Sequence, residues 1–247
     1  MAILVLEHSD RTGAMRLGRT LRNYGHRIRT VALHRGGMIP VDLDDVDGII
    51  SCGGPQSAYD DSLPWLAPQM GLLRAAHAAE MPIVGLCLGC QIMARALGGE
   101  VTRMDRPEIG WHEVKLSPIG REDPMFAGIA WTSMQAHWHN DHVSKLPPGA
   151  RLLASSERCK VQAWGLGLRT YAFQYHPEIE PGTMDAFISD EPDALTRAGL
   201  NADDLRRETS ERYPAFQRLS DRLFESIALF LMPVDRRFKG LVKDLHH

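Results

Sequence analysis

The stretch Gly85-Leu86-Cys87-Leu88-Gly89-Cys90-Gln91 directly follows the apolar run Met81-Pro82-Ile83-Val84. An apolar strand that leads into Gly-x-Cys-x-Gly and then into a helix is the pattern of a nucleophile elbow with cysteine at its tip. The flanking glycines permit the cramped backbone that presents one side chain above the edge of a sheet. Cys87 would then lie at a helix N-terminus, where the helix dipole favours thiolate over thiol. The stretch therefore predicts a sulfur nucleophile.

Strand and helix patterns alternate around this elbow over the first hundred residues. The expected strands are 2–6, 26–33, 48–50 and the elbow strand, and the expected helices are 14–24, 65–79 and 87–97. This alternation predicts an α/β fold with an open, mostly parallel (mixed) sheet and helices on both faces. Residues 100–175 instead resemble short strands and turns, of which 168–174 is expected to rejoin the main sheet.

The sequence contains no internal repeat and no long linker. We therefore expect one domain over residues 1–247, in which 181–247 forms a peripheral helical extension that ends in the basic segment 236–247. Five apolar residues of the extension at helical spacing predict one docking face. They are Phe216, Leu219, Leu223, Ile227 and Phe230.

The amino-acid composition and net charge indicate which kinds of binding partner to expect. The net charge of −3 and the 44% hydrophobic content are ordinary for a globular protein and give no reason to expect a nucleic acid or a membrane partner. No apolar run approaches the roughly 18 residues of a membrane-spanning helix. The four cysteines, Cys52, Cys87, Cys90 and Cys159, show no disulfide-framework spacing. We expect a protein of the reducing cytoplasm with free thiols.

A second motif supplies the base that a cysteine nucleophile needs. The segment Phe173-Gln174-Tyr175-His176-Pro177-Glu178 is an apolar strand that ends in His-Pro-Glu. If it lies beside the elbow strand, His176 emerges at the same sheet edge as Cys87, and Glu178 can orient the imidazole. This predicts a Cys87–His176–Glu178 catalytic triad.

A third motif, Gly53-Gly54-Pro55, follows the buried strand at 48–50. Its backbone amides should reach the same edge of the sheet. The amide of Gly54 could then join that of Leu88 in an oxyanion hole.

Two other chemical interpretations use some of the same residues. Cys87 and Cys90 form Cys-x-x-Cys, which could be a redox pair, although Cys90 also suits a small buried position. His137, His139 and Asp141 alternate as on one strand face, near His142, and such a set can bind zinc. Because substrate-loop residues are the commoner explanation, we expect no metal and no organic cofactor.

The three motifs together resemble the class I (triad) glutamine amidotransferases over roughly residues 1–180. Gly-Leu-Cys-Leu-Gly-Cys-Gln is similar to their nucleophile motif, Phe-Gln-Tyr-His-Pro-Glu to their His-Pro-Glu motif and Cys-Gly-Gly-Pro to their oxyanion loop. The similarity is strongest to the amidotransferase domain of GMP synthase and to free-standing proteins like it. The resemblance implies a flavodoxin-like open sheet and glutamine hydrolysis through a γ-glutamyl thioester.

The resemblance also implies roles for individual residues. Cys87 is the nucleophile, His176 the acid/base and Glu178 its orienting partner, with the oxyanion held by Gly54 and Leu88. The residues implied to bind substrate are Gln91, His139, Asn140 and Asp141. Trp138-His139-Asn140-Asp141 is similar to the family's Ser-His-Gly-Asp but has Trp for Ser and Asn for Gly, which is consistent with a different γ-glutamyl substrate.

The route of the ammonia leaves two enzyme functions open. GMP synthases carry an ATP-pyrophosphatase domain with a Ser-Gly-Gly-x-Asp-Ser loop, which does not occur in this sequence. The chain is thus expected to hydrolyse L-glutamine for a separate ATP-dependent synthase subunit, or to work alone as a γ-glutamyl peptidase or hydrolase. A non-catalytic regulatory subunit with the same fold is a third possibility, against which the intact triad argues.

Overall fold

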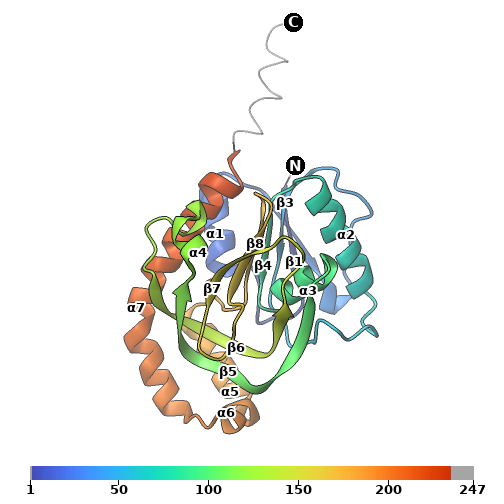
Figure 1. The fold of residues 1–247 in the computed structure, drawn as a ribbon. Coiled ribbons are helices and arrows are strands. Elements are labelled where there is room, and N and C mark those ends of the chain that lie inside the picture. The colour runs from blue at the N-terminus through green and yellow to red at the C-terminus, as the bar shows by residue number, and fades with distance from the viewer. Residues whose placement is uncertain (1, 235–247) are drawn as a thin grey trace, which may run out of the picture.

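A mixed sheet of nine strands organises residues 2–234, the part of the chain that the computed structural model describes (Figure 1). The strand order is β2-β1-β3-β4-β9-β8-β7-β5-β6. The first five strands in this order pair in parallel, and the remaining pairings are antiparallel. The predicted fold class is confirmed. The basic segment 236–247 lies outside the described residues.

The bounds of the elements agree with the sequence pattern over the first hundred residues. The strands are β1 (Ala2–Glu7), β2 (Ile28–Ala32), β3 (Val46–Ser51), β4 (Ile83–Leu86), β5 (Glu100–Leu116), β6 (Thr132–Lys145), β7 (Arg151–Ser155), β8 (Ala163–Leu166) and β9 (Thr170–Phe173). The α-helices are α1 (Met15–Asn23), α2 (Leu66–Ala78), α3 (Leu88–Ala96), α4 (Pro118–Glu122), α5 (Pro181–Asp190), α6 (Pro192–Ala198) and α7 (Ala202–Ser226).

The central strands are buried on both faces. Along β1, Ile3 and Val5 enter a core shared with α1 and α7, whereas Leu4 and Leu6 enter a core shared with α2 and α3. Successive side chains of a strand point to opposite faces, so the continuous apolar run of β1 reflects a sheet covered on both sides. In Figure 1 the two groups of helices lie on opposite sides of the sheet.

Strands β5 and β6 form one long antiparallel hairpin instead of the expected short strands, and they curve under the rest of the sheet (Figure 1). Pro107 and Gly110 interrupt the strand pattern in the sequence. The structure accommodates them with a register shift between Arg103 and Glu108 and with a positive φ of 88° at Gly110. A bulge of this kind bends a strand without ending its pairing.

Two other expectations change in detail. The segment 168–174 does rejoin the main sheet, where β9 pairs in parallel with β4, but Leu168 lies in the exposed turn before it. On the C-terminal helix Phe216, Leu223 and Ile227 are buried as predicted, whereas Phe230 is 58% exposed. A π-helical turn over Ile227–Leu231 shifts the helical period there, so Phe230 leaves the docking face.

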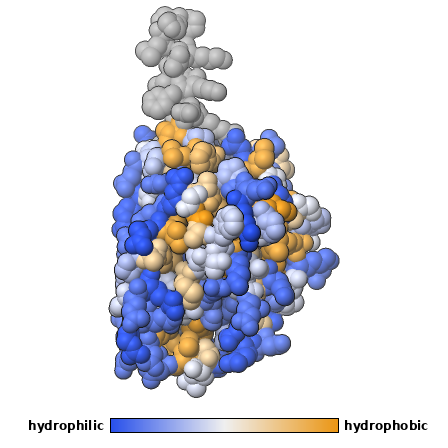
Figure 2. All heavy atoms as spheres, turned by 60° about the vertical axis from the view of Figure 1, so that its left-hand side comes forward, coloured by the Kyte–Doolittle hydropathy of each residue, from blue (hydrophilic) through white to orange (hydrophobic). Residues whose placement is uncertain are grey.

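The surface on the side of α4 and α7 is mostly hydrophilic, with a band of apolar residues between hydrophilic margins (Figure 2). Among residues 2–234, no helix combines the length and the apolar character needed to cross a bilayer.

The close approach of α3 to β3 gives a test of the fold. A methyl group added at Gly89 would overlap the carbonyl oxygen of Ser51. We expect Gly89→Ala to lower the free energy of unfolding by about 1–3 kcal/mol or more, because backbone must shift to relieve the overlap. The matched control is Gly182→Ala, where nothing lies within 4 Å of the added methyl group and stability should be unchanged or slightly raised. Urea denaturation of both variants measures the difference, and equal stabilities would contradict this account.

Candidate active site

Cys87 occupies the tight turn between β4 and α3. Its φ of 49° and ψ of −106° lie outside the regions that a non-glycine residue ordinarily adopts. The Cys87 N–H donates to the Phe173 carbonyl at 2.8 Å, and the Gly89 N–H donates to the Cys52 carbonyl at 3.0 Å. These bonds tie the turn to the two neighbouring strands, β9 and β3, and hold a strained backbone of the kind found at functional sites.

His176 lies three residues beyond the end of β9, the strand that pairs with β4. The His176 N–H donates to the Ala136 carbonyl at 2.9 Å, which fixes the backbone of the histidine against β6. The Nδ1 atom of His176 lies 2.7 Å from Oε1 of Glu178, and the two side chains are 3% and 0% exposed. The structure therefore brings together the imidazole and the carboxylate that the sequence pairs.

Burial opposes a charge on His176, but the negative charge of Glu178 and the proximity of Cys87 outweigh it. The pKa of His176 is consequently raised well above its ordinary value. The site thus favours an imidazolium between the sulfur and the carboxylate.

The side chains of Cys87 and His176 both pack against Gly53. A Cβ atom at Gly53 would lie 2.9 Å from Cε1 of His176 and 3.6 Å from Cβ of Cys87. A side chain at this position would therefore displace the imidazole, since only the contact with His176 is too short for a normal packing distance. The sequence motif predicts an amide role for Gly54, whereas the packing role of Gly53 is visible only in the three-dimensional contact.

Cys87 and His176 open into one cavity of about 540 Å³. Gly54 and Leu88 also line this cavity. Leu88 is the first residue of α3, so its N–H has no acceptor within the helix. The cavity lining also includes the four residues implied to bind substrate, Gln91, His139, Asn140 and Asp141.

Several of these predicted substrate contacts already bond within the protein. Gln91 Nε2 donates to the Asp141 carbonyl at 2.9 Å and to Gln174 Oε1 at 3.2 Å. The Asp141 carboxylate accepts from the hydroxyls of Ser57 and Tyr59 at 2.8 and 3.1 Å. The pocket wall is therefore cross-linked before any ligand binds, and Gln91 keeps only its carbonyl oxygen for a substrate.

Part of the segment after residue 181 also borders the cavity. Phe187 of α5 and Glu191, the residue after α5, line it. The Glu191 carboxylate accepts from Trp138 Nε1 at 3.0 Å and lies 3.3 Å from Arg11. The sequence analysis places the whole segment after residue 181 at the periphery, and no motif in it marks Phe187 or Glu191 as pocket residues.

The environment of Cys90 does not suit a redox pair with Cys87. Cys90 is fully buried, and Trp164 Nε1 donates to its sulfur at 3.3 Å. Burial raises the pKa of its thiol, which disfavours the thiolate that exchange chemistry requires. Its position fits the small buried residue that the sequence also suggested.

The histidines of the considered metal site lie together, but with a different carboxylate. His137 and His139 face Glu108 of β5, while Asp141 bonds to the loop hydroxyls described above. Burial would raise the pKa of Glu108, but hydrogen bonding to His139 and the nearby charges of His137 and His139 lower it to about 2. Sequence reasoning missed Glu108 because the pairing of β5 with β6 was not predicted, and Glu108 precedes the strand that the sequence pattern indicates from Gly110.

Comparison with known proteins is consistent with this geometry. Residues 14–191 match the glutamine amidotransferase class-I family. The chain is 30% identical to the glutamine amidotransferase-like protein YfeJ of Salmonella typhimurium over 178 residues, which cover 70% of this chain and 74% of that protein. It is 34% identical over 168 residues to a glutamine-hydrolyzing GMP synthase subunit of Archaeoglobus fulgidus, and the match covers 65% of this chain and 80% of that protein.

Longer relatives match over only part of their length. The chain is 35% identical to the glutamine-hydrolyzing GMP synthase of Clostridium novyi over 133 residues, which are 53% of this chain but 24% of that protein. Among solved structures, a glutamine amidotransferase from Methylobacillus flagellatus superposes with a TM-score of 0.83 at 28% identity, covering 91% of this chain and 92% of that one. The chain belongs to the class-I glutamine amidotransferase family.

Proposed function

We propose that the protein hydrolyses the side-chain amide of glutamine to glutamate and ammonia through a thioester on Cys87. The observation that carries this proposal is a strained elbow cysteine beside an imidazole whose Nδ1 lies 2.7 Å from a fully buried carboxylate. A nucleophile, an imidazole base beside it and a carboxylate that orients the imidazole are the parts that covalent acyl transfer needs.

In the first half-reaction the Cys87 sulfur attacks the carboxamide carbon. The amides of Gly54 and Leu88 hold the negative oxygen that develops there. His176 then gives its proton to the departing nitrogen, and ammonia leaves as the γ-glutamyl thioester forms. Throughout, Glu178 keeps the imidazole oriented and stabilises its positive charge.

In the second half-reaction His176 takes a proton from water, and the resulting hydroxide attacks the thioester carbon. The carbon–sulfur bond breaks, glutamate leaves and the Cys87 thiolate returns. A separate ATP-dependent synthase would receive the ammonia. The similarity to the Archaeoglobus fulgidus protein, which is one subunit of a GMP synthase, supports such a division of labour.

The size of the cavity favours a second candidate, a stand-alone γ-glutamyl hydrolase with the same triad. A volume of about 540 Å³ lies in the range of pockets that hold drug-sized ligands, and glutamine is smaller than such ligands. The lining also carries the charged groups of Arg11, Arg103 and Glu191. These could bind the remainder of a γ-glutamyl amide larger than glutamine.

Loss of the nucleophile or the base tests the shared chemistry. We expect Cys87→Ala to abolish turnover and to prevent covalent labelling by a glutamine-like electrophile, as detected by intact-protein mass spectrometry. His176→Ala should lower turnover by about 10²–10⁴-fold, because proton transfer is lost. Cys90→Ala is the matched control and should keep both labelling and turnover. Labelling that persists in folded Cys87→Ala, or normal turnover in His176→Ala, would refute the triad.

The role of Glu178 is tested by the titration of His176. In Glu178→Gln the raising effect of the carboxylate is removed while the lowering effect of burial remains, so the pKa of His176 should fall. The imidazole proton resonances measure this by NMR. Glu180→Gln, which removes an exposed carboxylate two residues away, should leave the pKa unchanged. An unaltered pKa in Glu178→Gln would show that the carboxylate does not set the charge of the imidazole.

Substrate comparison separates the two candidate functions. We expect the purified chain to release ammonia from glutamine with a kcat/KM above that for γ-glutamyl dipeptides. The reverse order, with amine release from dipeptides exceeding ammonia release, would identify the stand-alone hydrolase. The Cys87→Ala variant gives the background rate for both substrates.

A further inference from the structure

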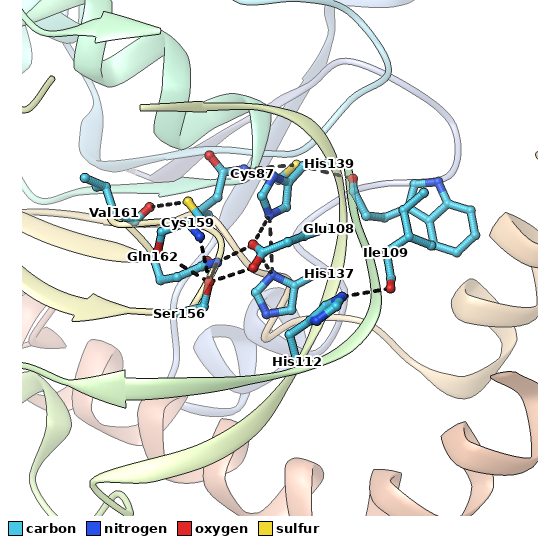
Figure 3. Close-up of polar contacts among 12 residues, drawn as sticks. Cys87, Glu108, Ile109, His112, His137, His139, Ser156, Cys159, Val161 and Gln162 are labelled. Atoms are coloured by element: carbon cyan, nitrogen blue, oxygen red, sulfur yellow. Dashed lines mark hydrogen bonds and ion pairs between the residues drawn. The ribbon is translucent and has the colours of Figure 1, made fainter. Parts of the chain in front are cut away.

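A second cluster of functional side chains lies directly behind the pocket wall, where β5 pairs with β6 (Figure 3). Glu108 of β5 stands opposite His139 of β6 in the antiparallel register. Residues directly opposite each other share one face of the sheet, and His137 shares that face because it precedes His139 by two positions. The hairpin thus brings together two imidazoles from alternate positions of β6 and a carboxylate of β5 that is 29 or more positions away from them in the sequence.

The separations of the three ligand atoms match a metal-binding triangle. Oε2 of Glu108 lies 3.1 Å from Nε2 of His139 and 3.6 Å from Nδ1 of His137. The two imidazole nitrogens lie 3.4 Å apart. Ligand atoms bound to a tetrahedral zinc ion at about 2.0–2.1 Å lie about 3.3–3.4 Å from one another. The three groups are already placed so that one ion could reach all of them.

The hydrogen bonds around His139 determine which of its nitrogens faces the cluster with a lone pair. Its Nδ1 lies 3.0 Å from the Asp141 carbonyl, an acceptor, so Nδ1 carries the hydrogen. In the neutral ring Nε2 then presents a lone pair toward the Glu108 carboxylate, and two acceptors face each other. A proton on Nε2 or a metal ion between the two groups removes this repulsion. A proton can be directed at one partner, whereas a divalent metal ion can contact Glu108, His137 and His139 together.

The surroundings of Glu108 have the outer hydrogen bonds that metal ligands usually make. Ser156 Oγ donates to Oε1 and Gln162 Nε2 donates to Oε2, both at 2.6 Å. Metal-bound histidines typically donate their other N–H to a carbonyl or carboxylate, as His139 does here, and ligating carboxylates are themselves hydrogen-bonded. Among the described residues, the ion-pair partners of Glu108 are these two histidines, with no lysine or arginine to balance its charge.

We propose that Glu108, His137 and His139 form a binding site for a divalent metal ion of the zinc class. Two imidazoles and one carboxylate are a ligand set that zinc and neighbouring transition metals accept. A second cavity of about 400 Å³ is lined by Glu108 and Ser156 among others and shares no lining residue with the Cys87 pocket, so the cluster also borders a separate cavity. This inference does not depend on the proposed glutamine hydrolysis, in which no step uses the site.

The predicted consequence is structural. A bound ion would join β5 to β6 behind the pocket and would hold His139, whose other nitrogen bonds to the Asp141 backbone. An ion that binds only the folded chain stabilises it by mass action. Zinc should therefore raise the Tm and stiffen the wall that carries Asn140 and Asp141.

Metal titration of the full chain tests the proposal without an activity assay. The parent protein is Cys87→Ala, which removes the thiolate of the pocket as a competing ligand. After treatment with a chelator and desalting, we expect it to bind one Zn²⁺ per chain by calorimetry and elemental analysis, with a rise in Tm. Co²⁺ in the same site should give the visible spectrum of a four-coordinate ion without a thiolate-to-metal charge-transfer band, because no sulfur is a ligand.

Substitutions then assign the site. Glu108→Gln in the Cys87→Ala background should weaken Zn²⁺ binding at least tenfold, and His137→Gln is a second variant if the first does not fold. The matched control, Glu113→Gln, makes the same change at a half-exposed carboxylate of β5 that lines the same outer cavity, and it should bind as the parent does. Absence of stoichiometric binding by the folded parent, undiminished binding by folded Glu108→Gln, or a thiolate band in the Co²⁺ spectrum would each overturn the proposal.

Discussion

The close contact between the start of α3 and the end of β3 is the constraint on which the site depends. The Gly89 N–H bonds to the Cys52 carbonyl, and Gly89 has no room for a side chain beside Ser51. This contact lets the chain turn directly from β4 into a helix and forces Cys87 into a strained conformation at φ 49°. The strain is balanced by hydrogen bonds to both neighbouring strands, so the sulfur is held at the sheet edge before any substrate arrives.

The parallel order of β3, β4 and β9 places the strained cysteine beside the other residues of the proposed active site. The carboxyl ends of neighbouring parallel strands meet at one edge of a sheet, where ligands of such folds usually bind. Gly53 follows β3, Cys87 follows β4 and His176 follows β9, so residues far apart in the chain come within contact of one another. A buried carboxylate behind His176 then keeps positive charge on the ring in a site where burial alone would remove it.

The β5–β6 hairpin links the pocket to the rest of the molecule. Its Ala136 carbonyl anchors the backbone of His176, and its residues 138–141 form one wall of the cavity. On the same strand His137 and His139 meet Glu108, and His139 belongs both to this cluster and to the pocket wall. The proposed metal site and the proposed active site therefore share strand β6, and His139 is the side chain that connects them.

The sequence by itself determined which segments form strands and helices around the elbow and which motifs carry the candidate site. The apolar runs with their glycine breaks predicted β1, β3, β4 and the helices between them, and the spacing of Gly-x-Cys-x-Gly, His-Pro-Glu and Gly-Gly-Pro predicted which residues meet. Only the tertiary structure decided the pairing of Glu108 with His139, the packing of Gly53 and the place of Phe187 in the pocket wall. These contacts join residues 30 or more positions apart. The periodic pattern of a strand or helix indicates which of its residues are buried, but it does not indicate which residues of another element they contact.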